Sequence, residues 1–256
     1  MVPMAEEDDC DPAARRARGA FATTRWTLVA EAAMGDSPEA EEAMEALSLR
    51  YWFPLYAFLR RKGLKAEQAE DMTQEFFAQR ILTKQIFKGS DRSRGKFRSW
   101  LLTSLQNFLN NERDKERAQK RGGGAVHLSL DFREGEERYL AEPFHNLTPE
   151  KIYARTWALT QLDATLDTLR DQYENRGQSA LFDELKSFLP GAGAPPPHRV
   201  VAERTGKTEA AIKMAVSRLR REFGKALRGT IGSTVSDAAE LEEEMRDLLN
   251  ALTSPT

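Results

Sequence analysis

Gly206-Lys207-Thr208 is the residue combination with which this sequence could bind a phosphate group. The same residue types end the P-loop of nucleotide-binding proteins, where lysine and backbone amides bind phosphate oxygens. A P-loop also needs a glycine five positions before its Gly-Lys pair, and Val201 occupies that position. Three prolines, 195–197, stand where the preceding strand would be required. The spacing therefore argues against a nucleotide site and favours the phosphate of a nucleic-acid backbone.

The residues after this turn have the periodicity of an amphipathic helix. Its apolar stripe consists of Ile212, Val216, Leu219, Phe223 and Leu227. Thr208 is suited to cap the helix N-terminus, and Glu209 favours its first turn. The polar face carries the candidate DNA-binding residues Lys207, Thr208, Lys213, Ser217, Arg218, Arg220 and Arg221.

A shorter helix precedes the turn. Val200, Val201 and Ala202 belong to it, and Gly206 can end it in the left-handed conformation. Two helices joined by a tight glycine turn, the second with a polar N-terminal face, predict a helix-turn-helix. The alternative is a surface hairpin of helices whose charged face is merely solvated.

The charge distribution predicts two surfaces that face a polyanion. The 256 residues have a net charge of only −2. Segment 88–121 nevertheless contains ten basic and four acidic residues, and segment 199–228 contains nine and three, so each has a net charge of +6. Acidic segments flank these blocks, with five acids in 1–11 and six in 237–247. Separate basic blocks of this kind are typical of nucleic-acid binding.

The first basic block contains a second helix with two distinct faces. Its expected core stripe is Phe97, Leu101, Leu105 and Phe108. The other face carries the candidate DNA-binding residues Trp100, Asn107, Asn110, Arg113 and Arg117. Amides match base edges, arginines match phosphates, and an aromatic ring outside the core can stack on an unpaired base. The alternative for Trp100 is a place in the core or in a contact between domains.

The helix expected over 66–82 presents an acidic face. Within AEDMTQEFF, residues 69–77, one side is apolar and the other carries Asp71, Gln74 and Glu75. Such a face is usually just solvated, but it is also what a basic protein partner would require.

Composition excludes several other classes of protein. With 40% hydrophobic and 30% charged residues and no long apolar run, we expect a soluble chain without membrane insertion. The first 19 residues lack the apolar segment of a secretory signal, and the single Cys10 fits a reducing cytoplasm. No Ser/His/Asp, Cys/His or metal-ligand set has suggestive spacing, so we expect neither an enzyme nor a metal or other cofactor.

Periodicity and capping residues predict an all-α protein without a β-sheet. The expected helices span 24–34, 38–62, 66–82, 96–121, 151–174, 178–189, 197–205, 208–230 and 237–252. The predicted organisation is a disordered segment 1–19, a first helical domain 20–121, an acidic linker 122–150, a helix-turn-helix domain 151–232, and a C-terminal amphipathic segment 233–256. Pro54 is expected to kink or split the helix that contains it.

These motifs, taken in order, resemble a known family. A helix of the AED-hydrophobe-TQEFF type, a basic helix of the FRSWLLTSLQNFL type, a linker and a C-terminal helix-turn-helix resemble bacterial RNA polymerase sigma factors. Within these the chain is similar to the extracytoplasmic-function group, which keeps only sigma regions 2 and 4. The TTRWTLV opening and the RGGG segment resemble a subgroup common in planctomycete-like bacteria.

The resemblance implies a cytoplasmic transcription initiation factor with core RNA polymerase and promoter DNA as partners, and it leaves room for an anti-sigma or other signalling protein. Asp71, Gln74, Glu75 and Phe76 match the helix of region 2 that docks on the polymerase. Residues 97–121 match the segment that melts and recognises the −10 element. Residues 199–221 match the part of region 4 that enters the major groove at −35.

A one-component helix-turn-helix regulator remains the alternative, although it would leave the 66–82 helix unexplained. For the C-terminal segment, Leu241, Met245, Leu248 and Leu252 form one apolar stripe. A helix of this length needs a docking surface. We expect it to dock within the chain, on the helix-turn-helix domain, and to lower the affinity for DNA through its acidic residues.

Overall fold

The computed structural model is helical throughout the residues that it describes. These residues are 29, 31–32, 37–83, 96–118, 130–141, 146–190, 193–235 and 237–253. Within these ranges there is no β-strand, as the all-α prediction requires. No described helix has both the length and the apolar character needed to cross a membrane. The predicted disordered segment 1–19 and most of the helix expected over 24–34 lie outside the described residues.

Helix α3 (Pro38–Arg61) begins where its sequence predicts. The Ser37 hydroxyl accepts a hydrogen bond from the Ala40 amide at 3.2 Å, and Pro38 occupies the first helical position. After the helix, Gly63 has a φ of 94°, which favours glycine. Pro54 lies inside α3, and the helix is not split there.

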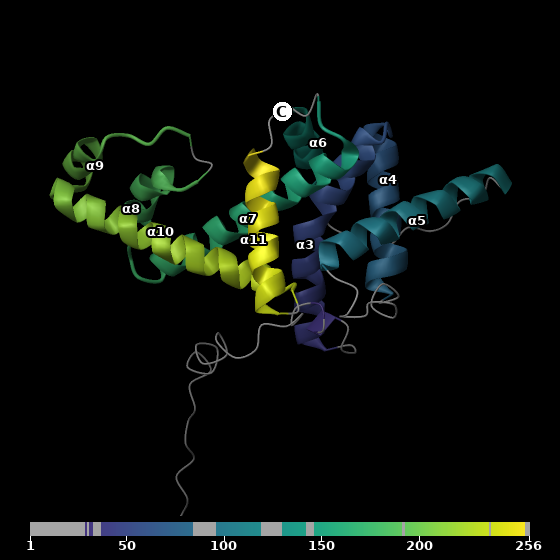
Figure 1. The fold of residues 1–256 in the computed structure, drawn as a ribbon, viewed down its shortest axis with the longest axis horizontal. Helices are drawn as coiled ribbons and strands as arrows, with labels where there is room; N and C mark the ends of the chain where they lie inside the picture. The colour runs from purple at the N-terminus through teal and green to yellow at the C-terminus, as the bar shows by residue number, and fades with distance from the viewer. Residues whose placement is uncertain are drawn as a thin grey trace, which may run out of the picture.

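Helix α4 (Ala66–Phe76) continues directly into the π-helical segment η2 (Phe77–Leu82). Helix α5 (Phe97–Ala118) extends away from this bundle and forms one end of the molecule's longest axis (Figure 1). The ring of Phe108 in α5 packs edge-on against Phe76 in α4, with ring centroids 5.6 Å apart. The apolar stripe predicted for the basic helix therefore faces the core.

Helix α6 (Phe132–Ala141) lies inside the segment 122–150, which was expected to be only a linker. The Phe132 ring packs edge-on against Trp52 of α3 at a centroid distance of 5.2 Å. The Glu136 carboxylate accepts hydrogen bonds from the Tyr56 hydroxyl at 2.6 Å and from Arg60 Nε at 2.8 Å. Because α6 has few apolar residues, these tertiary contacts rather than its sequence pattern hold it in place.

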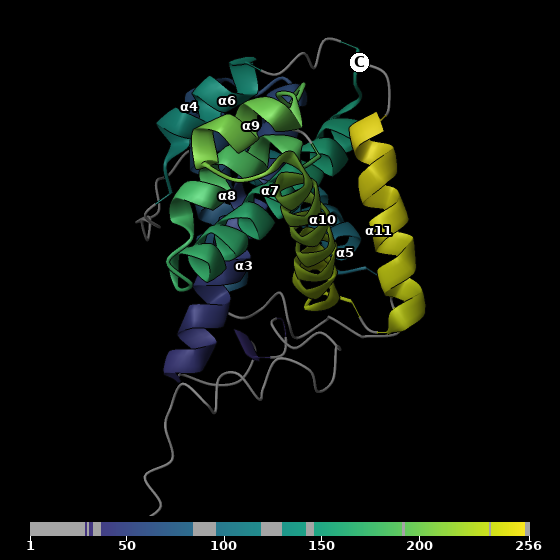
Figure 2. The same ribbon diagram turned by 90° about the vertical axis from the view of Figure 1, so that its left-hand side faces the viewer.

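Helix α7 (Pro149–Glu174) is the central element of the fold. Its N-terminus is capped by Thr148, whose hydroxyl accepts a hydrogen bond from the Lys151 amide. The helix packs against α3, α10 (Glu209–Gly232) and α11 (Ala238–Thr253). Figure 2 shows α7 running between α3 and α10, with α11 on the side of α10. Helix α7 therefore connects the elements predicted for the first and second domains.

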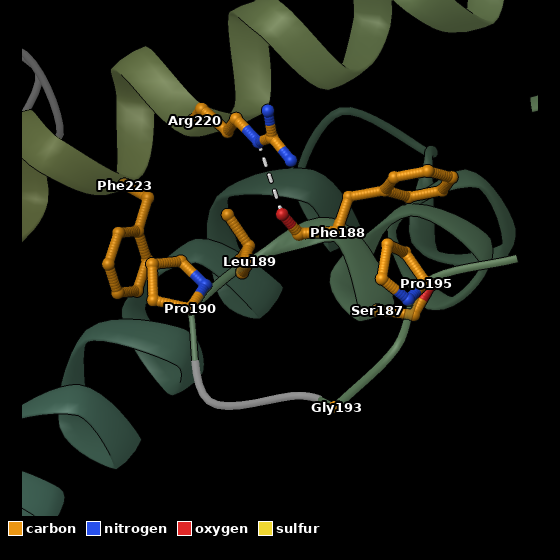
Figure 3. A pocket seen from close by; sticks show the side chains of 8 residues that line it. All are labelled: Ser187, Phe188, Leu189, Pro190, Gly193, Pro195, Arg220 and Phe223. Carbon is orange, nitrogen blue, oxygen red and sulfur yellow. Dashed lines mark hydrogen bonds between the residues drawn. The ribbon is translucent and has the colours of Figure 1, made fainter.

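The helix-turn-helix side contains α8 (Ser179–Leu185), the 3-10 turn η5 (Lys186–Phe188) and α9 (His198–Thr205) beside α10. A cavity of about 430 Å³ lies between η5 and α10. Figure 3 shows its wall, which includes Phe188, Pro195 and Phe223. Pro190, Gly193 and Pro195 of the Gly/Pro-rich segment after η5 also line this cavity.

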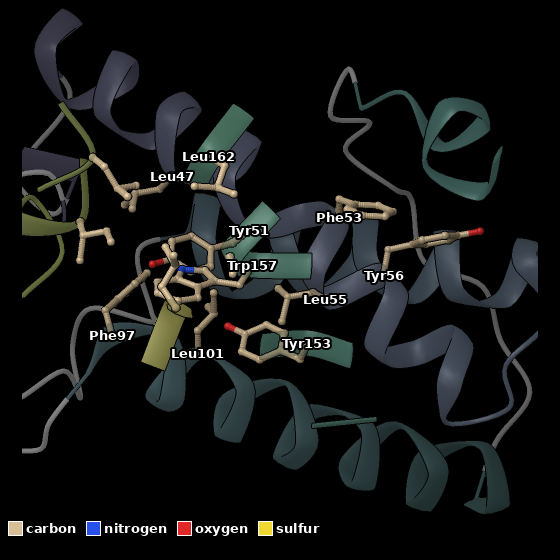
Figure 4. Close-up of a cluster of buried hydrophobic side chains, with 14 of the residues drawn as sticks. Leu47, Tyr51, Phe53, Leu55, Tyr56, Phe97, Leu101, Tyr153, Trp157 and Leu162 are labelled. Atoms are coloured by element: carbon tan, nitrogen blue, oxygen red, sulfur yellow. The ribbon is translucent and has the colours of Figure 1, made fainter. Parts of the chain in front are cut away.

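The buried apolar residues form one main cluster that runs through both predicted domains. At the junction of α3, α5 and α7 the side chains of Tyr51, Leu101 and Trp157 lie together (Figure 4). Leu169 of α7 continues the cluster toward Phe223 of α10. Because α7 contributes buried residues along its length, the two predicted domains share a core instead of having separate ones.

Candidate nucleic-acid interface

The turn between α9 and α10 has the geometry that its sequence predicts. Gly206 adopts the left-handed conformation with a φ of 65°, and the Lys207 amide donates a hydrogen bond to the Ala202 carbonyl at 3.0 Å. The Thr208 hydroxyl caps α10 by accepting a hydrogen bond from the Ala211 amide at 3.2 Å. The chain therefore forms two helices joined by a tight glycine turn.

Helix α10 buries the predicted apolar stripe and exposes the opposite face. All the candidate residues of this segment are exposed: Lys207, Thr208, Lys213, Ser217, Arg218, Arg220 and Arg221. The Lys213 ammonium lies 2.8 Å from the Glu209 carboxylate, and this hydrogen bond and charge lower the pKa of Glu209. Exposed pairs of this kind are weak, so a phosphate or base can displace the carboxylate.

Arg220 differs from the other candidates because its side chain points along the protein. Its Nε donates a hydrogen bond to the Phe188 carbonyl at 3.1 Å, at the edge of the cavity (Figure 3). This bond joins α10 to the end of η5. Arg220 thus supports the position of α10 and has less freedom than Arg218 or Arg221 to reach a groove.

Met214 is a residue of this face that the sequence pattern did not single out. Its side chain is 68% exposed between the polar residues Lys213 and Ser217. An exposed apolar side chain near the N-terminus of such a helix can contact the methyl group of thymine in the major groove. The sequence feature that could have identified Met214 is that it is an apolar residue, one position before Ala215, outside the apolar stripe of α10.

Helix α5 presents the second candidate surface. Its stripe of Phe97, Leu101, Leu105 and Phe108 is buried as predicted, and Asn107 and Asn110 are exposed. Trp100 is half-buried and packs against the core, with its ring 5.9 Å from that of Phe97. Arg113 and Arg117 belong to α5, but their side chains lie outside the described part of the structure.

The acidic face of α4 only partly matches its prediction. Asp71 is exposed, Glu75 is half-buried, and the Gln79 amide donates a hydrogen bond to the Glu75 carboxylate at 2.7 Å. Gln74 is 9% exposed and donates to Glu70. Phe76 is completely buried against Phe77 and Phe108, so it cannot touch a partner directly. Its part in the predicted contact is to hold α4 in place.

Two basic residues at the start of α5 face the C-terminal helix and not solvent. Lys96 and Arg98 form ion pairs with Glu243, Glu244 and Asp247 of α11. Their charges are therefore neutralised within the chain. The charge count along the sequence included Lys96 and Arg98 in the block expected to face DNA, because a sequence does not show which segments meet.

The two candidate DNA surfaces lie at opposite ends of the molecule. Helix α9 and the N-terminus of α10 form one end of the longest axis, and the C-terminal part of α5 forms the other (Figure 1). Among the described residues, no group of His, Cys, Asp and Glu side chains could hold a metal ion. The exposed polar groups at both ends are suited to hydrogen bonding and to charge pairing.

No protein-family model, no curated protein and no solved structure matches this chain. The interpretation of both surfaces therefore depends on their residues and geometry.

Proposed function

We propose that this chain is a transcription initiation factor that binds core RNA polymerase and directs it to promoters. Two separate exposed polar faces, on α10 and on α5 at opposite ends of the molecule, are the observation that carries the proposal. The α9–α10 helix-turn-helix would enter the major groove at the −35 element. The exposed Asn107 and Asn110 of α5 would contact the −10 element, where their amides match base edges.

The turn before α10 supports the first of these contacts. The helix N-terminus carries a partial positive charge and free amide groups, which favour a phosphate. The exposed Lys207 adds a full positive charge to the same region. Phosphate contacts would fix the orientation of α10, and Lys213, Met214 and Ser217 would then face the base edges.

The acidic face of α4, with Asp71 exposed and Glu75 half-buried, supports a contact with the polymerase. Asp71 and Glu75 lie on one side of a helix that is firmly held by the buried Ala69 and Phe76. A rigid acidic face increases the rate at which a basic partner surface is found. It does not contribute to DNA binding, since phosphates would be repelled.

A one-component regulator is the second candidate, and the cavity beside α10 favours it. At about 430 Å³ and with an apolar wall, the cavity has the size of a small-molecule site. Such a regulator would bind DNA without RNA polymerase, whereas an initiation factor would form a stoichiometric complex with it.

The test is reconstitution of the full chain with bacterial core RNA polymerase, followed by selection of bound DNA from a random library and run-off transcription. We expect a 1:1 complex and specific initiation. The double variant Asp71→Lys/Glu75→Lys should weaken the complex without changing binding of the chain alone to DNA. Reversal of two exposed acids on α7, Asp171→Lys/Glu174→Lys, is the matched control. DNA binding without any polymerase complex would support the regulator instead.

A further inference from the structure

Helix α11 is tied to the start of α5 by a cluster of ion pairs. Arg98 Nε lies 2.7 Å from Glu244 Oε1, and an Arg98 terminal nitrogen lies 2.7 Å from Asp247 Oδ2. The Lys96 ammonium contacts Glu243 at 3.1 Å and Glu244 at 3.4 Å, and it also pairs with Asp247. Two cations and three carboxylates therefore join α11 to α5.

The centre of this cluster is anchored in the protein core. Glu244 is only 2% exposed. The Arg98 guanidinium lies 4.6 Å from the ring centroid of Trp157, and the Arg98 carbonyl accepts a hydrogen bond from the Tyr153 hydroxyl at 2.9 Å. Loss of the Glu244 carboxylate with α11 still in place would leave Arg98 buried without its partner, which is strongly unfavourable. We therefore expect the contact between α11 and α5 to be stable.

The same helix is tied to the end of α10. Arg228 of α10 pairs with Glu242 of α11. Next to it, an Arg50 terminal nitrogen donates to Ser233 Oγ at 3.0 Å and so joins α3 to the turn that follows α10. At the other end of α11, Arg155 of α7 donates to the Leu252 carbonyl at 3.0 Å. Helix α11 thus contacts α5, α7 and α10; its buried ion pair is with Arg98 of α5, whereas the pair with Arg228 is exposed and therefore weak.

Helices α5 and α10 extend from α11 in opposite directions (Figure 1). From Arg228 to Glu209, and from Arg98 to Ala118, each helix is about 30 Å long at 1.5 Å per residue. A rotation of about 10° at their base would move either tip by about 5 Å. One base pair of B-DNA is about 3.4 Å long. A rotation of this size at the base of α5 or α10 would therefore displace a candidate DNA surface by more than one base pair.

We propose that α11 is a brace that fixes the separation of the two DNA surfaces and thereby selects promoters of one spacer length. The spacer part of this proposal rests on the proposed function. Lys96, Arg98, Glu243, Glu244 and Asp247 are positioning residues, because they act through the helices that they join.

The positions of the ion pairs distinguish a brace, which would hold α5 and α10 in place, from an inhibitor, which would cover their DNA-binding faces. The described ion pairs reach α5 at its first turn and α10 at Arg228, nearly two turns beyond Arg221. The exposed Asn107, Asn110 and Lys213 lie farther along each helix. The acidic residues of α11 thus neutralise basic groups at the base of the two helices and leave the tips open to DNA.

The first measurement is the distance between spin labels on the two tips in the full chain. Labels are attached at Ala210→Cys in α10 and Asn111→Cys in α5, with Cys10→Ser to remove the natural thiol. We expect a narrow distance distribution. In Glu244→Gln/Asp247→Asn the distribution should broaden by about 5 Å or more, because the base of α5 is no longer held by these ion pairs and can rotate. An unchanged width would overturn the proposal.

Two further variants make this result specific. Asp167→Asn/Asp183→Asn also removes two charges, but the ion pairs described for these residues are with Arg170 and Lys186, three positions away. This control should keep the narrow distribution. If the first variant loses its helical circular dichroism, Glu243→Gln/Asp247→Asn replaces it, since the buried pair of Glu244 with Arg98 is then retained. Equal broadening in the control would overturn the proposal.

The second measurement uses the holoenzyme and promoter DNA recovered by the selection above, with spacers lengthened or shortened by one base pair. One base pair turns the two elements by about 35° relative to each other. We expect the natural chain to lose most of its affinity and Glu244→Gln/Asp247→Asn to lose little. Tighter binding of the variant at every spacer length would identify α11 as an inhibitor and overturn the brace. Broadened distances without any specific DNA binding would reject the proposed function and the spacer role, while the mechanical role would stand.

Discussion

Burial and pairing decide which charged residues hold this fold together. Glu136 of α6 illustrates this, since both its carboxylate oxygens accept hydrogen bonds from Arg60, at 2.8 and 2.7 Å. Burial alone would raise the pKa of Glu136, but the hydrogen bonds from Arg60 and Tyr56 and the charge of Arg60 lower it below 4.5. The ionised carboxylate is therefore the form that stabilises the docking of α6 on α3.

This shift predicts how stability depends on pH. A depressed folded pKa contributes stability above about pH 4.5 and loses it as the pH falls through the folded value. At pH 7, Glu136→Gln should lower the free energy of unfolding by about 1–3 kcal/mol. Chemical denaturation at a series of pH values should show this difference shrinking below pH 4.5. A difference that is constant from pH 7 to pH 3 would contradict the assignment.

Helices form here where local sequence supports them, and one forms because of its neighbour. Helix α6 has a glycine at its centre, which weakens a helix by about 1 kcal/mol relative to alanine. A Cβ atom at Gly135 would lie 2.7 Å from Cη2 of Trp52. Close packing on the Trp52 ring therefore explains a residue that helix propensity disfavours.

Two glycine substitutions distinguish the effect of side-chain packing from the effect of helix propensity. Gly135→Ala should destabilise the protein by about 1–3 kcal/mol through overpacking, and it should reduce amide-exchange protection over 132–141. Gly224→Ala in α10 is the control, because its Cβ would meet no atom within 4 Å. That control should stabilise by up to about 1 kcal/mol. Stabilisation by both substitutions, measured by denaturant unfolding, would show that α6 is not held against Trp52.

The whole molecule has one hydrophobic core, with a proposed DNA surface at each end. Trp157 is 1% exposed and lies with Tyr51 of α3, while Leu169 on the same helix belongs to the part of the cluster that α10 shares. A cluster without a gap couples the stabilities of the elements on both sides. The first and second predicted domains should therefore not unfold independently.

Trp157→Ala tests this coupling. Truncation of a buried tryptophan costs about 3–5 kcal/mol. Hydrogen exchange followed by mass spectrometry should show α10 losing protection together with α3, whose Tyr51 lies beside Trp157. Leu140→Ala, at a side chain that is 69% exposed, should change stability by less than about 0.5 kcal/mol. Retained protection of α10 alone would indicate two separate cores.

Apart from α6, the sequence by itself determined which of the described segments are helices, and it determined how several of them begin and end. Ser37 and Thr208 cap α3 and α10 through bonds to amides three residues away, and Gly206 ends α9. The apolar stripe of α10 faces the core. These features depend on residues within a few turns of each other, so their spacing in the sequence is sufficient to predict them. The exposed polar face that we propose to bind DNA follows from the same periodicity.

Only the tertiary structure decided which helices meet, and this changed the roles of individual residues. Lys96 and Arg98 contact carboxylates about 150 positions away in the sequence, as the separations of 151 and 146 residues show. The packing of the helices also buries Phe76. It places the Arg220 side chain where it can donate a hydrogen bond to the Phe188 carbonyl. The expected docking of α11 within the chain is confirmed, but its acids pair mainly with α5 and not with the helix-turn-helix. An ion pair between distant segments depends on the packing of several helices at once, and no local spacing specifies it.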